Sequence, residues 1–92
     1  MSFEEPLKTG FTIYSKSGCP NCRNVKNLLK KGNIEFQSID CDDYLLFERE
    51  EFLSFIEEKI GKEYKSFPMI FHNDNFIGGF AETETYLQSL VN

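Results

Sequence analysis

Apolar and polar positions follow two different periods along the chain, and the change of period separates short strand-like segments from longer helix-like ones. Residues 11–15 (Phe-Thr-Ile-Tyr-Ser) are rich in β-branched and aromatic side chains, as strands are. Apolar residues three and four positions apart, such as Val25, Leu28 and Leu29, instead predict a helix. The pattern as a whole predicts, in chain order, strand 11–15, helix 20–31, strand 34–39, helix 44–60, strand 67–71, strand 75–77 and helix 82–91.

Residues that start helices, stop helices or form tight turns lie at the ends of these segments. Pro20 suits the first position of a helix, where a backbone N–H would have no partner. Gly32 is expected at the end of that helix, and Asn73 and Asp74 favour a hairpin turn between the last two strands. The order β-α-β-α-β-β-α therefore predicts an α/β fold: a mixed four-stranded sheet, parallel at its start and antiparallel at its hairpin, with helices on both faces.

Length and charge narrow the class of protein. The 92 residues suffice for one domain, so we expect residues 1–92 to form a single domain, and we expect a monomer. The formal net charge of −5 argues against binding to nucleic acid and against docking on anionic membranes, because both need clustered cations. Neither a basic, apolar secretory signal nor a membrane span is expected from the sequence.

The three cysteines carry the clearest chemical signal. An odd number, with Cys19 and Cys22 only three positions apart, does not suit a secreted disulfide scaffold. It suits a reduced compartment in which a close pair does redox chemistry or binds a metal, so we expect a cytoplasmic protein. Zinc would need a second pair of ligands, and the remaining candidates, Cys41 and His72, stand apart in the sequence. We therefore expect no metal site, and a buried structural pair is the other alternative.

Cys19 lies where the first strand gives way to the first helix, directly before the helix-starting proline. Unpaired N–H groups and the helix dipole stabilise a thiolate there, and the thiolate is the reactive form of cysteine. We expect the pKa of Cys19 to fall from the free value of about 8.5 into the range of about 3.5 to 7.5. Lys16, Arg23 and Lys26 form a positive patch around this thiolate. For Arg23 and Lys26, a solvated helix face is an equally good interpretation.

Cys22 comes one helical turn later and is expected to point towards the protein interior. A thiol at this offset is able to attack a mixed disulfide formed on Cys19, because a three-residue separation at a helix start permits disulfide geometry. Cys19 is therefore predicted to be the nucleophile of a redox pair, and Cys22 the resolving cysteine.

Four features together resemble the glutaredoxin family, and the likeness extends along nearly the whole chain. They are the order of strands and helices, residues 16–22 (Lys-Ser-Gly-Cys-Pro-Asn-Cys), residues 66–68 (Ser-Phe-Pro) before a strand, and residues 78–80 (Gly-Gly-Phe). The resemblance implies a thioredoxin-like fold in which Pro68 is a cis-proline that turns the Phe67 backbone towards Cys19. The residue alone leaves open a trans-proline that begins an edge strand.

The resemblance also implies a glutathione site near the cysteines. Lys16 would bind the glycyl carboxylate as a charge-assisted partner. The Phe67 backbone, presented by Pro68, would form hydrogen bonds with the cysteinyl part in the manner of an added strand. Gly79 would let the backbone approach the ligand closely, because glycine has no side chain.

Ala81 and Glu82 match the family positions that bind the γ-glutamyl end of glutathione. Both depart from the usual pattern, because Ala81 lacks a hydroxyl and Glu82 is longer than the usual aspartate. These changes bear on affinity for glutathione rather than on redox chemistry. Asn21, between the cysteines, replaces a common aromatic residue and bears on the reduction potential.

By resemblance, the chain is expected to be a glutathione-dependent thiol–disulfide oxidoreductase that reduces protein disulfides and glutathione mixed disulfides. Glutathione would be a co-substrate, with no cofactor bound, and ribonucleotide reductase is a candidate protein substrate by family analogy. Two alternatives stay open. One is a carrier of a [2Fe–2S] cluster held by Cys19 and external glutathione, and the other is a redox carrier that takes electrons from a thioredoxin reductase.

Overall fold

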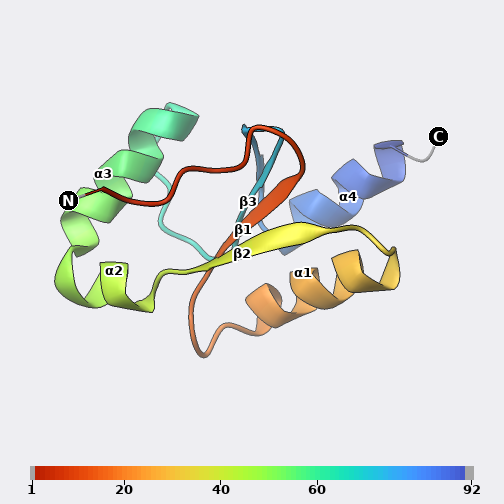
Figure 1. Cartoon of the computed structure of the whole chain (residues 1–92), viewed down its shortest axis with the longest axis horizontal. Coiled ribbons are helices and arrows are strands. Elements are labelled where there is room, and N and C mark those ends of the chain that lie inside the picture. Colours follow the sequence, from red (N-terminus) through yellow and green to blue (C-terminus); the bar gives the residue numbers. More distant parts are fainter. Residues whose placement is uncertain (1, 91–92) are drawn as a thin grey trace.

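The computed structural model describes residues 2–90 of the chain. The chain forms both strands and helices, and Figure 1 shows the strands in the middle of the molecule with helices around them. In chain order the elements are β1 (Phe11–Ser15), α1 (Pro20–Lys31), β2 (Phe36–Asp40), α2 (Asp42–Phe47), α3 (Arg49–Ile60), β3 (Met69–His72), β4 (Asn75–Gly78) and α4 (Phe80–Leu90). No helix among residues 2–90 is both long and apolar enough to cross a membrane.

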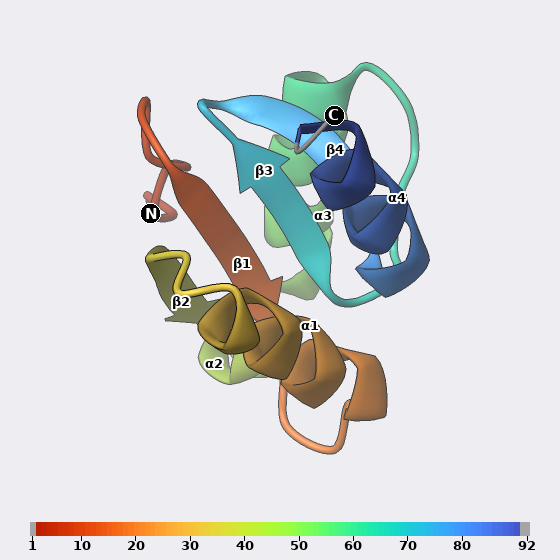
Figure 2. The same ribbon diagram turned by 90° about the vertical axis from the view of Figure 1, so that its right-hand side faces the viewer.

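The strands form the predicted mixed sheet of four, in the order β2-β1-β3-β4. β1 runs parallel to β2 and antiparallel to β3, and β3 and β4 form the antiparallel hairpin (Figure 2). Ser15 pairs with Asp40, and Tyr14 pairs with Met69. The end of β1, the end of β2 and the start of β3 therefore meet at one end of the sheet, and the loop that carries Cys19 leaves the sheet there.

Helices bury both faces of the sheet, as predicted, and each face has its own apolar cluster. Figures 1 and 2 show α1 and α4 on the opposite side of the sheet from α3. The cluster under α1 and α4 consists of Phe11, Ile13, Val25, Leu29 and Ile70. The cluster under α3 consists of Tyr14, Ile39, Cys41, Phe52, Ile56, Met69 and Phe71. Successive strand residues point to opposite faces, which is why β1 contributes to both clusters.

The single helix predicted over residues 44–60 is wrong, because the chain forms two helices there, α2 and α3. Glu48 between them has φ −144° and ψ 45°, which is not helical. Ordinary helix-forming residues flank Glu48, so the sequence contains no stop signal at this position. Ser17 hydrogen-bonds the first residue of α2 at the end of the sheet, whereas α3 packs on the sheet face. The break lets the two segments take different directions, and the observed order is β-α-β-α-α-β-β-α.

α1 ends in a way that shortens the predicted strand 34–39. The N–H of Ile34 donates to the carbonyl of Leu29 at 2.9 Å, and Asn33 takes a left-handed φ of 55°. This is a Schellman ending, in which the residue after the cap is left-handed. The left-handed position is therefore Asn33 rather than Gly32, and β2 begins two residues later than predicted because Ile34 closes the helix.

The last strands and the last helix also differ slightly from their predicted bounds. β3 begins at Met69 rather than at residue 67, because Pro68 has no N–H to donate to a neighbouring strand. α4 begins at Phe80, two residues earlier than predicted. Its predicted last residue, 91, lies outside the described residues, as do residues 1 and 92 of the predicted domain.

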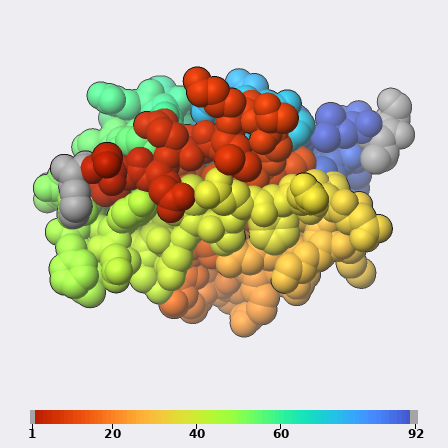
Figure 3. Space-filling view, viewed as in Figure 1, coloured from red at the N-terminus to blue at the C-terminus, as the bar shows by residue number. Residues whose placement is uncertain are grey.

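The segment before β1 lies across the molecule and closes the cluster under α3. In Figure 3 this segment, coloured red, runs between the green part of the chain and the yellow part. The Tyr14 hydroxyl donates to the carbonyl of Glu4 at 2.6 Å, and burial raises the pKa of Tyr14, so the phenol keeps the proton that it donates. The Phe3 ring contacts the Phe52 and Phe55 rings at centroid distances of 5.5 and 5.3 Å.

Phe52 is the residue whose truncation should cost the fold most clearly. It is fully buried, and its ring centroid lies 6.0 Å from that of Tyr14 and 6.4 Å from that of Phe67. Phe52→Ala is expected to lower the free energy of unfolding in urea by about 3–5 kcal/mol, because it leaves a cavity between α3 and the sheet. The matched control is Phe47→Ala, at a 74% exposed position, with an expected change within about 0.5 kcal/mol. Equal effects of the two substitutions would contradict the packing described.

Candidate active site

Cys19 and Cys22 form a disulfide at the start of α1, with their Cα atoms 5.3 Å apart. Cys19 is the N-cap residue and is half-buried, whereas Cys22 is only 2% exposed. The backbone N–H of Cys22 points at the Cys19 sulfur, with 3.2 Å between nitrogen and sulfur. This N–H is one of the helix-start donors that stabilise an anionic sulfur once the disulfide is reduced. The geometry matches the predicted division into an accessible sulfur and an inner one.

The loop before Cys19 takes a shape that glycine permits. β1 ends at Ser15, and Gly18 then adopts φ 69°, in the left-handed region where other residues are strained. Cys19 follows in an extended conformation (φ −114°, ψ 101°), and Pro20 begins the helix. The chain thereby turns from the sheet into α1 within four residues, and the Cys19 sulfur comes to lie at the helix tip.

Asp42, at the first position of α2, holds this loop from the side. It accepts a hydrogen bond from the Ser17 N–H at 2.9 Å and another from the Ser17 hydroxyl. These bonds hold the pKa of the Asp42 carboxyl below its ordinary value, so the carboxylate is ionised at neutral pH. The Asp42 N–H in turn donates to the Asp40 carboxylate at 2.9 Å. The Asp42 carboxylate thus ties the active-site loop to the end of β2, a role that the sequence analysis did not assign.

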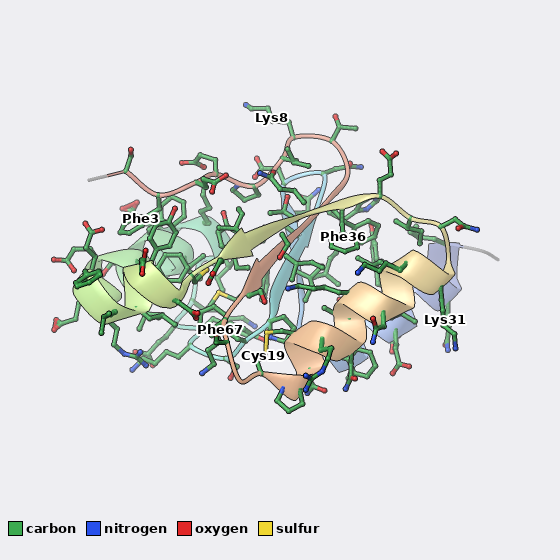
Figure 4. All side chains as sticks on the ribbon, turned by 60° about the horizontal axis from the view of Figure 1, so that its bottom comes forward. Phe3, Lys8, Cys19, Lys31, Phe36 and Phe67 are labelled. Carbon is green, nitrogen blue, oxygen red and sulfur yellow. A yellow bond between two sulfur atoms is a disulfide. The ribbon has the colours of Figure 1, made fainter. Side chains whose placement is uncertain are left out.

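Lys16, Phe67 and Pro68 lie at the same end of the sheet as the cysteines. The Lys16 ammonium stands 5.4 Å from the centroid of the Phe67 ring, which is a cation–π distance. The Phe67–Pro68 peptide bond is cis, as the family resemblance implied. Pro68 immediately precedes Met69, the partner of Tyr14 near the end of β1. In the view of Figure 4, Phe67 and Cys19 are on the same side of the molecule.

Gly79 and Glu82 form the start of α4 next to the cis-proline. Glu82 accepts a hydrogen bond from the Gly79 N–H at 2.8 Å, the contact by which a third-position glutamate caps a helix. A Cβ atom at position 79 would lie 3.6 Å from both the Pro68 carbonyl and the Tyr64 hydroxyl, which is ordinary van der Waals contact, whereas Gly78 has φ 133° and a Cβ there would meet the Glu82 side chain at 2.8 Å. Burial and the Glu82 carboxylate raise the pKa of Tyr64. Ala81 is exposed in the first turn of the helix.

The predicted basic residues divide into two groups. Lys16 and Lys26 share a hollow of about 240 Å³ beside the active-site loop. Its remaining wall consists of Ser15, Ser17, Ser38 and Asp40. Arg23 is exposed on α1 and has no ion pair with the residues that the structure describes. Two of the three cations therefore lie together next to the redox site, and Arg23 matches the solvated interpretation.

Cys41 is fully buried in the cluster under α3, apart from the redox pair. Its thiol lies 3.6 Å from the Ile39 carbonyl, to which it donates. Burial raises the pKa of this thiol to about 12, so it is neutral at physiological pH. Within residues 2–90, no group of three or more His, Cys, Asp or Glu side chains is placed to hold a metal ion.

The structure brings together the predicted site residues from three separate stretches of sequence. Lys16 and the cysteines come from the loop and helix after β1, Phe67 and Pro68 from the approach to β3, and Gly79 to Glu82 from the start of α4. Sequence reasoning missed Asp42 and Tyr64. Asp42 belongs to an acidic run whose residue types are typical of a helix start. The signal that could have identified it is its position directly after β2, the strand that runs parallel to β1.

This arrangement is that of a dithiol oxidoreductase on a thioredoxin-like sheet, and the chain is a thiol–disulfide oxidoreductase. The family model described as Glutaredoxin matches residues 11–77, from the start of β1 into β4. The chain belongs to the glutaredoxin family.

Relatives and solved structures agree with this placement. The glutaredoxin-like protein NrdH of Lactococcus lactis subsp. cremoris is 33% identical over 73 residues, which are 79% of this chain and 90% of that protein. Glutaredoxin 1 of Rickettsia conorii is 31% identical over 67 residues, 73% of this chain and 61% of that protein. The crystal structure of glutaredoxin 1 from Francisella tularensis complexed with cacodylate is similar with a TM-score of 0.77 and 31% identity, over 89% of this chain and 95% of that one. The thioredoxin-like fold is thereby confirmed.

The three thiols of the reduced protein are expected to react with iodoacetamide in a fixed order. At pH 8, Cys19 should be alkylated first, and Cys41 should stay unmodified while the protein is folded, because its raised pKa keeps it neutral and its burial excludes the reagent. Peptide mass spectrometry of samples quenched at successive times measures the order, and addition of urea should release Cys41 for reaction. Alkylation of Cys41 at the rate of Cys19 in the folded protein would contradict the site described.

Proposed function

We propose that the chain reduces protein disulfides and glutathione mixed disulfides with glutathione as its electron donor. The observation that carries the proposal is the Cys22 N–H directed at the Cys19 sulfur, at the tip of α1. That sulfur is half-exposed, and the Cys22 sulfur lies behind it within bonding reach. A stabilised outer thiolate with an inner thiol is the arrangement that two-step disulfide exchange requires.

The reaction begins with reduced Cys19. Its thiolate attacks one sulfur of the substrate disulfide, the substrate S–S bond breaks, and the other substrate sulfur leaves as a thiolate that takes up a proton. The Cys22 thiol then loses its proton and attacks Cys19 in the mixed disulfide, which releases the second substrate thiol and forms the Cys19–Cys22 disulfide seen here. Two glutathione molecules restore both thiols and leave as one glutathione disulfide, so two electrons pass from glutathione to the substrate.

The residues beside the cysteines suit the two ends of glutathione. The Lys16 ammonium is proposed to bind the glycyl carboxylate, and the Phe67 backbone to pair with the cysteinyl part, as an added strand pairs. At the other end, one Glu82 oxygen accepts from the Gly79 N–H, which leaves the second oxygen to accept from the γ-glutamyl ammonium. The N–H of Ala81, in the first turn of α4, has no partner within the helix and suits the γ-glutamyl carboxylate.

Proteins that carry a reducible disulfide are the proposed substrates, with ribonucleotide reductase as the candidate by analogy with the family. The proposed compartment is the cytoplasm, because a glutathione pool there is reducing enough to regenerate a pair of the family's usual potential, roughly −200 to −230 mV. No bound cofactor enters the proposed reaction, and glutathione acts as a co-substrate.

Single substitutions of the two cysteines should separate the two steps. Cys19→Ser is expected to reduce turnover of both protein disulfides and glutathione mixed disulfides to background, because it removes the nucleophile. Cys22→Ser is expected to abolish reduction of protein disulfides but to retain most activity on glutathione mixed disulfides, because a second glutathione resolves the intermediate. NADPH consumption coupled through glutathione reductase measures both reactions.

The same assay decides between the two electron donors. Wild-type protein is supplied either with glutathione and glutathione reductase or with thioredoxin reductase alone, and the first should give the faster turnover. Faster turnover with thioredoxin reductase would overturn the proposed donor while preserving the dithiol chemistry. Normal turnover by Cys19→Ser would contradict the chemistry itself.

A further inference from the structure

Two large apolar side chains project into solvent at the end of α2. Leu46 is 72% exposed and Phe47 is 74% exposed, whereas the other exposed large hydrophobics among residues 2–90, Leu7 and Leu90, are 39% and 53% exposed. None of the six residues of α2 is buried, so the α2 apolar pair, Leu46 and Phe47, contributes little to the core. Adjacent, solvated Leu and Phe side chains form an exposed apolar surface of the kind that partner proteins cover.

The α2 apolar pair is structurally linked to the redox site. Asp42 begins the same helix and accepts two hydrogen bonds from Ser17, two positions before Cys19. α2 rises only about 8 Å from Asp42 to Phe47. Figure 1 shows α2 and the loop between β1 and α1 on the same lower side of the molecule. A standard protein interface covers about 800 Å² on each partner, so a protein whose disulfide reaches Cys19 also has the extent to reach α2.

The charge around the pair selects one kind of partner. Residues 40–51 contain six of the chain's fifteen acidic side chains and one of its ten basic ones. The rest of the chain therefore holds nine of each, and the whole formal net charge of −5 falls within this segment. The acidic side chains are Asp40, Asp42, Asp43, Glu48, Glu50 and Glu51. The apolar pair thus belongs to the segment that carries the net negative charge, and such a segment complements an apolar contact site flanked by lysine and arginine.

We propose that the α2 apolar pair and the carboxylates of residues 43–51 form a docking surface for disulfide-bearing substrate proteins that present basic and apolar side chains in a segment apart from the disulfide, on the side that faces α2. This inference rests on the proposed function. The apolar contact supplies the affinity, because desolvated aromatic and aliphatic anchors dominate protein interfaces, and the carboxylates steer the encounter. Small disulfides do not extend to α2, so docking distinguishes protein substrates from them.

A single-turnover experiment tests the docking surface without depending on the electron donor. Protein reduced with dithiothreitol and then desalted is mixed with one of three oxidants. Two are peptides of equal length, each with a ring closed by one disulfide and a tail long enough to reach α2. The tail of the first carries Lys and Leu, and the tail of the second carries Glu and Leu. The third oxidant is hydroxyethyl disulfide. Wild type should reduce the cationic peptide about tenfold faster than the anionic one at low ionic strength, and the preference should shrink as salt is added.

Leu46→Ser combined with Phe47→Ser is expected to slow reduction of the cationic peptide by about fivefold or more and to leave the hydroxyethyl disulfide rate unchanged. The matched control is Leu90→Ser, which removes an exposed leucine at the far end of α4 and should leave all three rates unchanged.

An effect of the double substitution no larger than that of the control would overturn the docking surface. So would a dimer in analytical ultracentrifugation that the double substitution abolishes, because a second copy would then occupy the pair. Failure of the wild type to reduce any of the three disulfides would overturn the proposed function, and the docking surface with it.

Discussion

The contact between the Cys22 N–H and the Cys19 sulfur is the interaction on which the rest of the site depends. It exists because the sulfur occupies the N-cap of α1, where a helix-start N–H is able to bond a side chain; the Cys22 N–H is shared between the Cys19 sulfur at 3.2 Å and the Cys19 carbonyl at 3.1 Å. The fold keeps this helix end in place through its apolar face. Val25 and Leu29 are fully buried against the sheet, so the start of α1 has a defined position relative to β1. Packing in the core thus fixes the position of the group that reacts.

Two further contacts orient the loop around this sulfur, and they come from opposite sides. On the β2 side, the Asp42 carboxylate accepts hydrogen bonds from the Ser17 N–H and from the Ser17 hydroxyl. On the β3 side, the Lys16 ammonium lies over the Phe67 ring next to the cis-proline. The β3 side, with Gly79 and Glu82 beyond it, is the proposed glutathione site. The β2 side leads to the acidic helix α2, so the two kinds of reaction partner would approach the same sulfur from different directions.

The sequence predicts the elements whose signals are local. The predicted bounds of β1 and α1 equal the observed ones, because a β-branched run and a helix that starts at proline are recognised without any distant contact. The break at Glu48 and the left-handed Asn33 were not predicted, because neither residue type marks such a position by itself. Asp42 was missed for a different reason. Its partner Ser17 is 25 positions away, and periodicity describes only the neighbourhood of each residue.

The cis-proline and the glycine pair at the start of α4 were predicted only through the family resemblance. A proline alone leaves a trans bond as the ordinary expectation. The sequence shows that residues 40–51 carry the net negative charge and that acidic and basic residues are equal in number in the rest of the chain. The significance of this segment depends on the exposure of Leu46 and Phe47. Helical periodicity did not indicate that exposure, because the predicted helix was continuous through residue 48.

The most direct test of the account is a titration of the Cys19 thiol in the reduced Cys22→Ser protein. Serine keeps the backbone N–H at position 22, and the thiolate is followed by its absorbance near 240 nm, with Cys41→Ala introduced to remove the third sulfur. We expect an apparent pKa of Cys19 below about 7.5, because helix-start donors stabilise the anion. A pKa at or above the value of a free cysteine, about 8.5, would contradict it.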